Sequence, residues 1–257
     1  GCGRFHITKA FPELRGQNER SASYTPARPV KKEPPVNYKK VDLMPMWKDM
    51  QEIPADHEFK TISIDILNDL GWRYDPVNER YFIPYFSRSK KSIPFGQWRN
   101  LKQGPRFNFW KDAKPTMYGT WNLEPGETLF LVEGCSDAAV LDYCAVPWIA
   151  APSAASGELV KAMAGWCKEN GVKLVYAGDN DVAGDKLREA LDQVMPYRVK
   201  QPRQPYKDWG DMLEAEGFES VSDYCMEELM PASYKPTPEE EKTPLEKVQD
   251  VFPGARE

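Results

Sequence analysis

The chain has 257 residues, a formal net charge of -5, and shares of apolar (41%) and charged (28%) residues that are ordinary for a globular protein. No run of about 18 apolar residues is present, which argues against a membrane-spanning helix. The N-terminus shows no apolar leader, so the expected compartment is the cytoplasm. Five cysteines are too few for a disulfide framework in a chain of this length, and we expect Cys135, Cys144 and Cys167 to be reduced and packed.

Four segments are expected along the chain. Residues 1–58 combine a short remnant of a preceding domain with a polar, proline-rich stretch typical of a flexible linker. Residues 59–120 are expected to form a small basic α+β subdomain, and residues 121–230 an α/β domain. Residues 231–257 have the composition of a polar tail or a second linker.

In the α+β subdomain we expect a helix over 62–70, ended by Gly71, and strands over 80–86 and 92–98. From residue 128 onward, apolar strands alternate with amphipathic helices, which implies a central parallel sheet flanked by helices. The expected strands are 128–132, 147–150, 172–177 and 197–200. The expected helices are 136–144 with Ser136 as N-cap, 156–170 closed by Gly171, and 182–194.

The charge is distributed unevenly between these two parts. Residues 59–118 carry eleven Lys or Arg against five Asp or Glu, a balance of +6. Residues 121–229 carry nine against twenty, a balance of -11. A groove for a polyanion beside an acidic, cation-holding face would give this pattern. An ordinary charged surface would give it too, so the asymmetry is weak support.

Acidic residues follow three of the expected parallel strands, where functional groups collect in such sheets. They are Glu133, Asp179, Asp181, Asp208 and Asp211. Crowded carboxylates repel each other, and a divalent cation relieves that repulsion. Oxygen ligands without neighbouring histidines or paired cysteines favour Mg²⁺ (or Mn²⁺) over zinc, and Mg²⁺ can hold a substrate phosphate. An isolated Asp-x-Asp is more often a solvated turn, and Glu133 by itself could be a carboxylate at a helix N-terminus. Three acidic groups in this order are more specific.

The segment LFLVEGCSDAAVL, with Glu133, Gly134 and Asp137, resembles the first motif of TOPRIM domains. The segment YAGDNDVAGDKL resembles their Asp-x-Asp motif in its primase form, and Lys207-Asp208 with Asp211 is similar to the stretch that closes the domain in primases. This resemblance covers about residues 127–215. More loosely, residues 70–102 resemble the RNA polymerase domain of short-tailed phage primase-helicases, with a helix ending in Gly-Trp, an aromatic hairpin and a basic strand.

The resemblance implies a DNA primase core that makes short RNA primers on single-stranded DNA by Mg²⁺-dependent nucleotidyl transfer. The implied metal ligands are Glu133, Asp179, Asp181, Asp208 and Asp211, of which the first three are also the implied catalytic residues. The implied contacts to nucleotide or template are Arg99, Lys102, Arg106 and Lys207. For Arg99, Lys102 and Arg106, exposed charges on a surface hairpin are the alternative interpretation.

The implied partners are the single-stranded DNA template, ribonucleoside triphosphates, the RNA primer, a replicative helicase and a DNA polymerase, in the host cytoplasm if the chain is phage-encoded. Members of the family usually begin with a zinc ribbon of paired cysteines. Cys2 and His6 cannot complete a tetrahedral zinc site, so zinc is expected only in a missing N-terminal ribbon. The phosphate-binding Gly-x-x-x-x-Gly-Lys-Ser/Thr motif of a helicase is absent from these 257 residues.

Two other functions remain open from the sequence. A TOPRIM nuclease would use the same carboxylates, but Ala183-Gly184 after Asp181 and the Lys207-Asp208 pair are typical of the primase form. A non-catalytic nucleic-acid-binding TOPRIM module would be expected to lose the acidic residues, which this chain keeps. A topoisomerase would need a large separate DNA-gating domain, for which the chain has no room.

Overall fold

The computed structural model describes residues 38–102 and 105–229. The expected tail remnant and most of the expected linker (residues 1–37) lie outside the described residues, and so does the expected polar tail (residues 231–257).

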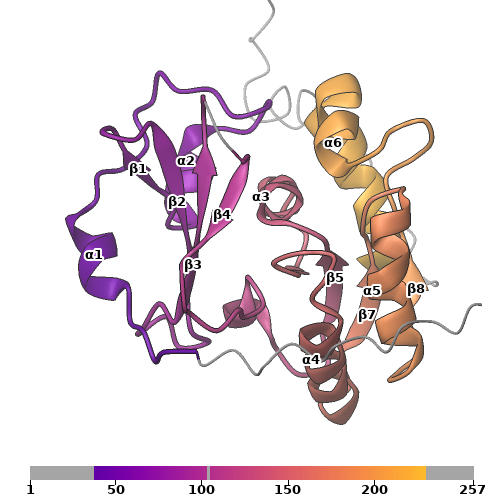
Figure 1. The fold of residues 1–257 in the computed structure, drawn as a ribbon. Helices are drawn as coiled ribbons and strands as arrows, with labels where there is room; N and C mark the ends of the chain where they lie inside the picture. The colour runs from indigo at the N-terminus through magenta and orange to yellow at the C-terminus, as the bar shows by residue number, and fades with distance from the viewer. Residues whose placement is uncertain (1–37, 103–104, 230–257) are drawn as a thin grey trace, which may run out of the picture. The chain divides into compact units, whose positions relative to one another are not determined.

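Two four-stranded sheets organise the described chain (Figure 1). The first is antiparallel in the order β1-β2-β3-β4, and the second is parallel in the order β6-β5-β7-β8. The strands are β1 Arg73–Asp75, β2 Arg80–Tyr85, β3 Phe95–Asn100, β4 Phe107–Phe109, β5 Thr128–Val132, β6 Trp148–Ala150, β7 Lys173–Tyr176 and β8 Arg198–Val199. The helices are α1 Met44–Asp49, α2 Ile64–Asp69, the 3-10 helix η3 Thr120–Asn122, α3 Cys135–Tyr143, α4 Gly157–Glu169, α5 Val182–Asp192 and α6 Trp209–Leu229.

Strand β2 shows why the antiparallel sheet is covered on both faces. Its side chains alternate in direction. Tyr81, Ile83 and Tyr85 belong to a core that also contains residues of α2 and α3, whereas Phe82 belongs to a separate core beneath α1. Helix α1 lies within residues that the sequence assigned to a linker, and Leu43 beside it is only 4% exposed. We call residues 38–118 the N-terminal region.

The parallel sheet has helices on both faces, as expected. Phe130 and Val132 of β5 pack into the core shared with α3 and α6, whereas Leu129 and Leu131 pack into the core shared with α4 and α5. The expected fold class, an α/β domain with a central parallel sheet preceded by a small α+β region, is confirmed. We call residues 119–229 the C-terminal region.

The two regions share one core, and helix α3 lies between the two sheets (Figure 1). At the junction, Tyr118 and Ala150 exchange two backbone hydrogen bonds of 2.9 and 2.8 Å. The Trp72 indole N–H also donates to the Tyr118 hydroxyl at 2.9 Å. These buried contacts hold the edge of β6 against the N-terminal region and thereby fix the position of one sheet against the other.

The structure differs from the sequence expectations in several details. Strand β3 begins at Phe95 rather than 92, because Pro94 has no N–H for the ladder and the Ile93 carbonyl accepts from Leu43 instead. Gly134 rather than Ser136 caps α3, and the Ser136 hydroxyl accepts from Arg99 Nη1 at 3.2 Å. Helix α6 was not expected at all.

The reason for missing α6 lies at Gly217, whose φ of +81° is left-handed and divides the helix into two segments. The buried residues before the kink (Trp209, Met212 and Leu213) and after it (Val221 and Cys225) therefore do not follow one continuous helical period.

Two further expectations concern cysteines and membranes. Cys135, Cys144 and Cys167 are buried thiols, as expected. Among the described residues, no helix combines the length and apolar composition needed to cross a membrane.

Candidate active site

A cavity of about 230 Å³ lies where the carboxyl ends of the parallel strands meet the N-terminal region. Four carboxylates line it: Glu133, Asp137, Asp179 and Asp208. Three basic side chains line it as well: Lys60, Arg106 and Lys207. The sequence expectation that acidic groups after three separate strands come together is therefore met for Glu133, Asp179 and Asp208.

Glu133 is fixed by hydrogen bonds to a single carboxylate oxygen. Its Oε1 accepts from the backbone N–H of Asp179 at 3.1 Å and from the Tyr176 hydroxyl at 3.3 Å. Burial, followed by the neighbouring charge of Asp179, raises the pKa of Glu133 to about 7. At neutral pH this group is therefore poised between its charged and neutral forms, which suits either a metal ligand or an acid/base group.

Asp179 and Asp181 lie on either side of Asn180, whose amide donates to the carbonyls of Pro202 and Tyr206, each at 2.8 Å. These bonds pin the Asp-x-Asp loop to the segment that carries Lys207. The Lys207 ammonium lies 3.4 Å from Asp181 Oδ2 and 4.0 Å from Asp179 Oδ2. Burial and then the charge of Asp208 raise the pKa of Asp179 to about 6.

Asp208 comes from the loop before α6 and accepts two hydrogen bonds at Oδ1. One is from Lys60 Nζ at 3.2 Å, and the other is from the backbone N–H of Asp211 at 2.8 Å. Burial by itself would raise the pKa of Asp208, but these two partners and the backbone N–H of Gly210 together outweigh it and lower the pKa. Asp211 itself is exposed and does not line the cavity, so the structure does not group its carboxylate with the others.

Two charged residues of the cavity, Asp137 and Lys60, were not assigned a role from the sequence. Asp137 is only 7% exposed, and burial followed by the charge of Asp179 raises its pKa to about 7. Lys60 reaches the site from the N-terminal region, and its side chain is 15% exposed. The Glu-Gly-x-x-Asp spacing was a signal for Asp137. No signal in the sequence placed Lys60 beside Asp208, which is 148 residues away.

The three basic residues of the hairpin, Arg99, Lys102 and Arg106, lie in different surroundings, and only Arg106 lines the cavity. Arg106 is exposed and lines the cavity. Arg99 is half-buried behind the cavity wall, where it donates to Ser136 and lies 4.5 Å over the Phe59 ring. Burial lowers the pKa of Arg99 to about 10. Lys102 pairs with Glu79 and does not line the cavity.

The cavity fits a hard divalent cation, although within residues 38–102 and 105–229 no three His, Cys, Asp or Glu side chains form a ready-made ligand cluster. Asp137 Oδ1 and Asp179 Oδ1 are buried, and within these residues neither has a hydrogen-bond partner. Orphaned carboxylate oxygens of this kind are costly unless a cation approaches them. Mg²⁺ needs few protein ligands, because it keeps several waters and shares substrate phosphates.

This chain resembles solved structures, two of which are described here. The primase fragment of the bacteriophage T7 primase-helicase protein superimposes with a TM-score of 0.54 at 17% identity, covering 76% of this chain and 81% of that chain. The second belongs to the complex of bacteriophage T7 lagging-strand DNA polymerase with primase domains of two gp4 subunits bound to an RNA/DNA hybrid and dTTP. It has a TM-score of 0.53 at 16% identity and covers 70% of this chain and 90% of that chain.

No protein-family model matches the chain, and no curated protein does. The comparison therefore rests on the structural likeness, and at 16–17% sequence identity this likeness shows the fold alone. The described residues have the fold of a phage primase fragment.

Proposed function

We propose that this chain is the core of a DNA primase, which joins ribonucleotides into short RNA primers on a single-stranded DNA template. The observation that supports it best is the cavity itself, in which the carboxylates Glu133, Asp179 and Asp208 face Arg106 and Lys207. Carboxylates suit a metal bound to a triphosphate, and the basic side chains suit the phosphates directly. The fold shared with a phage primase fragment is consistent with this assignment.

In this reaction the 3′ hydroxyl of the growing primer attacks the α-phosphorus of the incoming triphosphate, and pyrophosphate leaves. A divalent cation bound at the site would neutralise the charge that develops on the phosphate oxygens. Asp179, Asp181 and Asp208 would hold that cation, and Asp137 would complete the negative surface behind it. Lys207 and Arg106 would orient the triphosphate, while Glu133, with its raised pKa, would ligate the cation or take the proton of the hydroxyl.

A single assay tests the proposal against its alternatives. The chain is incubated with Mg²⁺, labelled ribonucleoside triphosphates and single-stranded DNA, and the products are separated by size. We expect template-dependent RNA oligomers, absent when EDTA replaces Mg²⁺. Shortening of the DNA would instead identify a nuclease, and DNA binding without any product would identify a non-catalytic module. Either of these last results would reject the primase assignment.

The separation of the hairpin residues gives a matched pair of variants. Arg106→Gln removes a cation that lines the cavity, so it should weaken DNA or nucleotide binding and reduce the slope of log K against log salt by about 0.7. Lys102→Gln removes an exposed cation outside the cavity and should leave both quantities unchanged. The affinity of each variant and its salt dependence are measured by fluorescence titration between low and high salt. Equal effects of the two substitutions would show that this hairpin acts only as a general basic surface.

The T7 polymerase complex involves primase domains, an RNA/DNA hybrid and dTTP. For this chain, we propose two partners. A DNA polymerase would receive the primer, and a replicative helicase would expose the template.

A further inference from the structure

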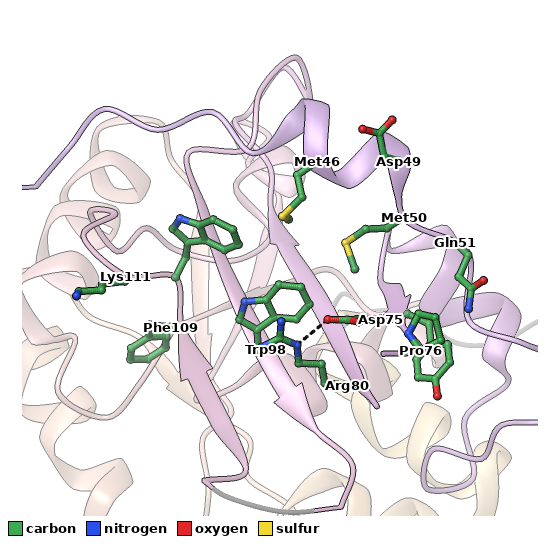
Figure 2. Close-up of a pocket in the computed structure, with 12 residues that line it drawn as sticks. Met46, Asp49, Met50, Gln51, Asp75, Pro76, Arg80, Trp98, Phe109 and Lys111 are labelled. Carbon is green, nitrogen blue, oxygen red and sulfur yellow. Dashed lines mark hydrogen bonds and ion pairs between the residues drawn. The ribbon is translucent and has the colours of Figure 1, made fainter. Parts of the chain in front are cut away.

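A second and larger cavity, of about 720 Å³, opens on the outer face of the antiparallel sheet (Figure 2). Met46 and Met50, from helix α1 and its C-cap, form one side, and Trp98 and Trp110 form the other. We call this cavity the tryptophan groove. The cavity of the candidate active site, lined by Glu133, Asp179 and Asp208, is called the catalytic cavity from here on. The tryptophan groove lies on the opposite face of β3 from it, since Gln97 lines the catalytic cavity and the next residue, Trp98, lines the groove.

The indole rings in the groove are held in place. Trp98 and Trp110 stack at an interplanar angle of 30° with centroids 6.2 Å apart. The Arg80 guanidinium lies 3.7 Å over the Trp98 ring and is itself bonded to Asp75 at 2.9 Å, as Figure 2 shows. Both indoles are only half-buried. They therefore form a rigid, partly exposed aromatic platform, and an ordered platform costs little entropy when a flat ring stacks on it.

Strand β4 connects the groove with the catalytic cavity. Phe107, at its start, lines the catalytic cavity, while Phe109, at its end, and the following Trp110 and Lys111 line the groove. Three strand residues span about 10 Å along β4. Because the two cavities open on opposite faces of the sheet, a chain molecule that joins them would also pass around this strand. β4 is also the edge of its sheet.

The sequence along this edge places three aromatic residues between two cations. Residues 106–111 read RFNFWK; Arg106 and Lys111 are exposed, and Phe109 is 45% exposed. Proteins that bind single strands combine cations for the phosphates with aromatic rings for the bases. The excess of positive charge over residues 59–118 favours a polyanion. In the groove the charge of Asp75 is paired with Arg80, and the phosphates would lie on the side of Lys111 and away from Asp49.

We propose that the tryptophan groove binds unpaired bases of the single-stranded DNA template, with the phosphate backbone along β4 toward the catalytic cavity. The identification of this strand as template rests on the proposed function. The binding of the bases does not, because it requires neither metal nor nucleotide. The groove would hold the template beyond the base that is being copied.

The test uses the whole chain, without nucleotide or Mg²⁺, and measures the affinity for dye-labelled dT12 by fluorescence anisotropy. Trp110→Leu removes the stacking ring but keeps an apolar side chain, and it should weaken binding by about fivefold or more. The control Trp166→Leu changes an indole on α4 that lines neither cavity, and it should leave the affinity unchanged. A dT12 analogue with abasic sites should bind wild type and Trp110→Leu equally, because it has no bases to stack. Thermal melting confirms that the variants are folded.

A second measurement does not depend on any variant. Ultraviolet crosslinking of a 5-iodouracil oligonucleotide should attach it to the peptides that contain Trp98 or Trp110. Unchanged dT12 affinity in Trp110→Leu, or crosslinks only elsewhere, would overturn the groove assignment even if primer synthesis is found. Markedly tighter binding of rU12 than of dT12 would overturn the template assignment in favour of the RNA product. If the chain makes no primers but its dT12 affinity still depends on Trp110, the proposed function would be rejected and the groove would remain a DNA-binding site.

Discussion

Asp179→Asn is expected to reduce primer synthesis by about 10²–10³-fold or more while leaving the protein folded. The substitution keeps the shape of the side chain but removes a negative charge that the proposed metal site requires. In the metal-free protein that charge is unfavourable, since burial and Asp208 raise the pKa of Asp179 to about 6. Thermal stability without Mg²⁺ should therefore stay level or rise slightly, whereas the stabilisation that Mg²⁺ gives to wild type should be lost.

The measurements are initial rates of primer synthesis and thermal melting with and without Mg²⁺. Asp185→Asn, which changes an exposed aspartate on the neighbouring helix α5, is the matched control and should behave like wild type in both. Synthesis by Asp179→Asn at a rate near that of wild type would show that this carboxylate is not part of the metal site.

Gly184→Ala is expected to impair both stability and synthesis, because the glycine lies against Tyr176 and Asp179, whose hydrogen bonds position Glu133. A Cβ at residue 184 would lie 2.5 Å from the Tyr176 hydroxyl oxygen and 2.9 Å from the Asp179 carbonyl oxygen, and closer still to Glu133 Oε1. These groups must shift to admit a methyl group. We expect a loss of about 1–3 kcal/mol in the free energy of unfolding and a loss of at least about tenfold in synthesis rate.

Gly165→Ala provides the comparison within the same fold. Gly165 lies in helix α4, and a Cβ there would meet no atom within 4 Å. This substitution should raise the free energy of unfolding by about 0.5–1 kcal/mol, because alanine favours helix over glycine, and should leave synthesis unchanged. Urea unfolding and the primer assay measure both variants. If Gly184→Ala were as stable and active as Gly165→Ala, the position of Glu133 would not matter for the reaction.

The C-terminal region could be predicted from the sequence largely because its signals are local. Apolar runs such as 128–132 are long enough to identify buried strands, and the buried residues of helix α4 recur at a helical period. Once the strands are known to be parallel, the residues that follow them must meet at one edge. This is why Glu133, Asp179 and Asp208 were expected together and are found in one cavity. Their role as metal ligands stays a prediction.

The tertiary structure decided which distant residues complete the site. Lys60 reaches Asp208 only because the N-terminal region packs against the end of the parallel sheet. Arg106 and Lys102 belong to the same basic hairpin, yet only Arg106 lines the cavity, since Lys102 pairs with Glu79. The tryptophan groove likewise needs α1 and β3 from segments about 50 residues apart. Periodicity in a sequence shows which face of a strand is buried, but the packing of the whole chain determines what covers that face.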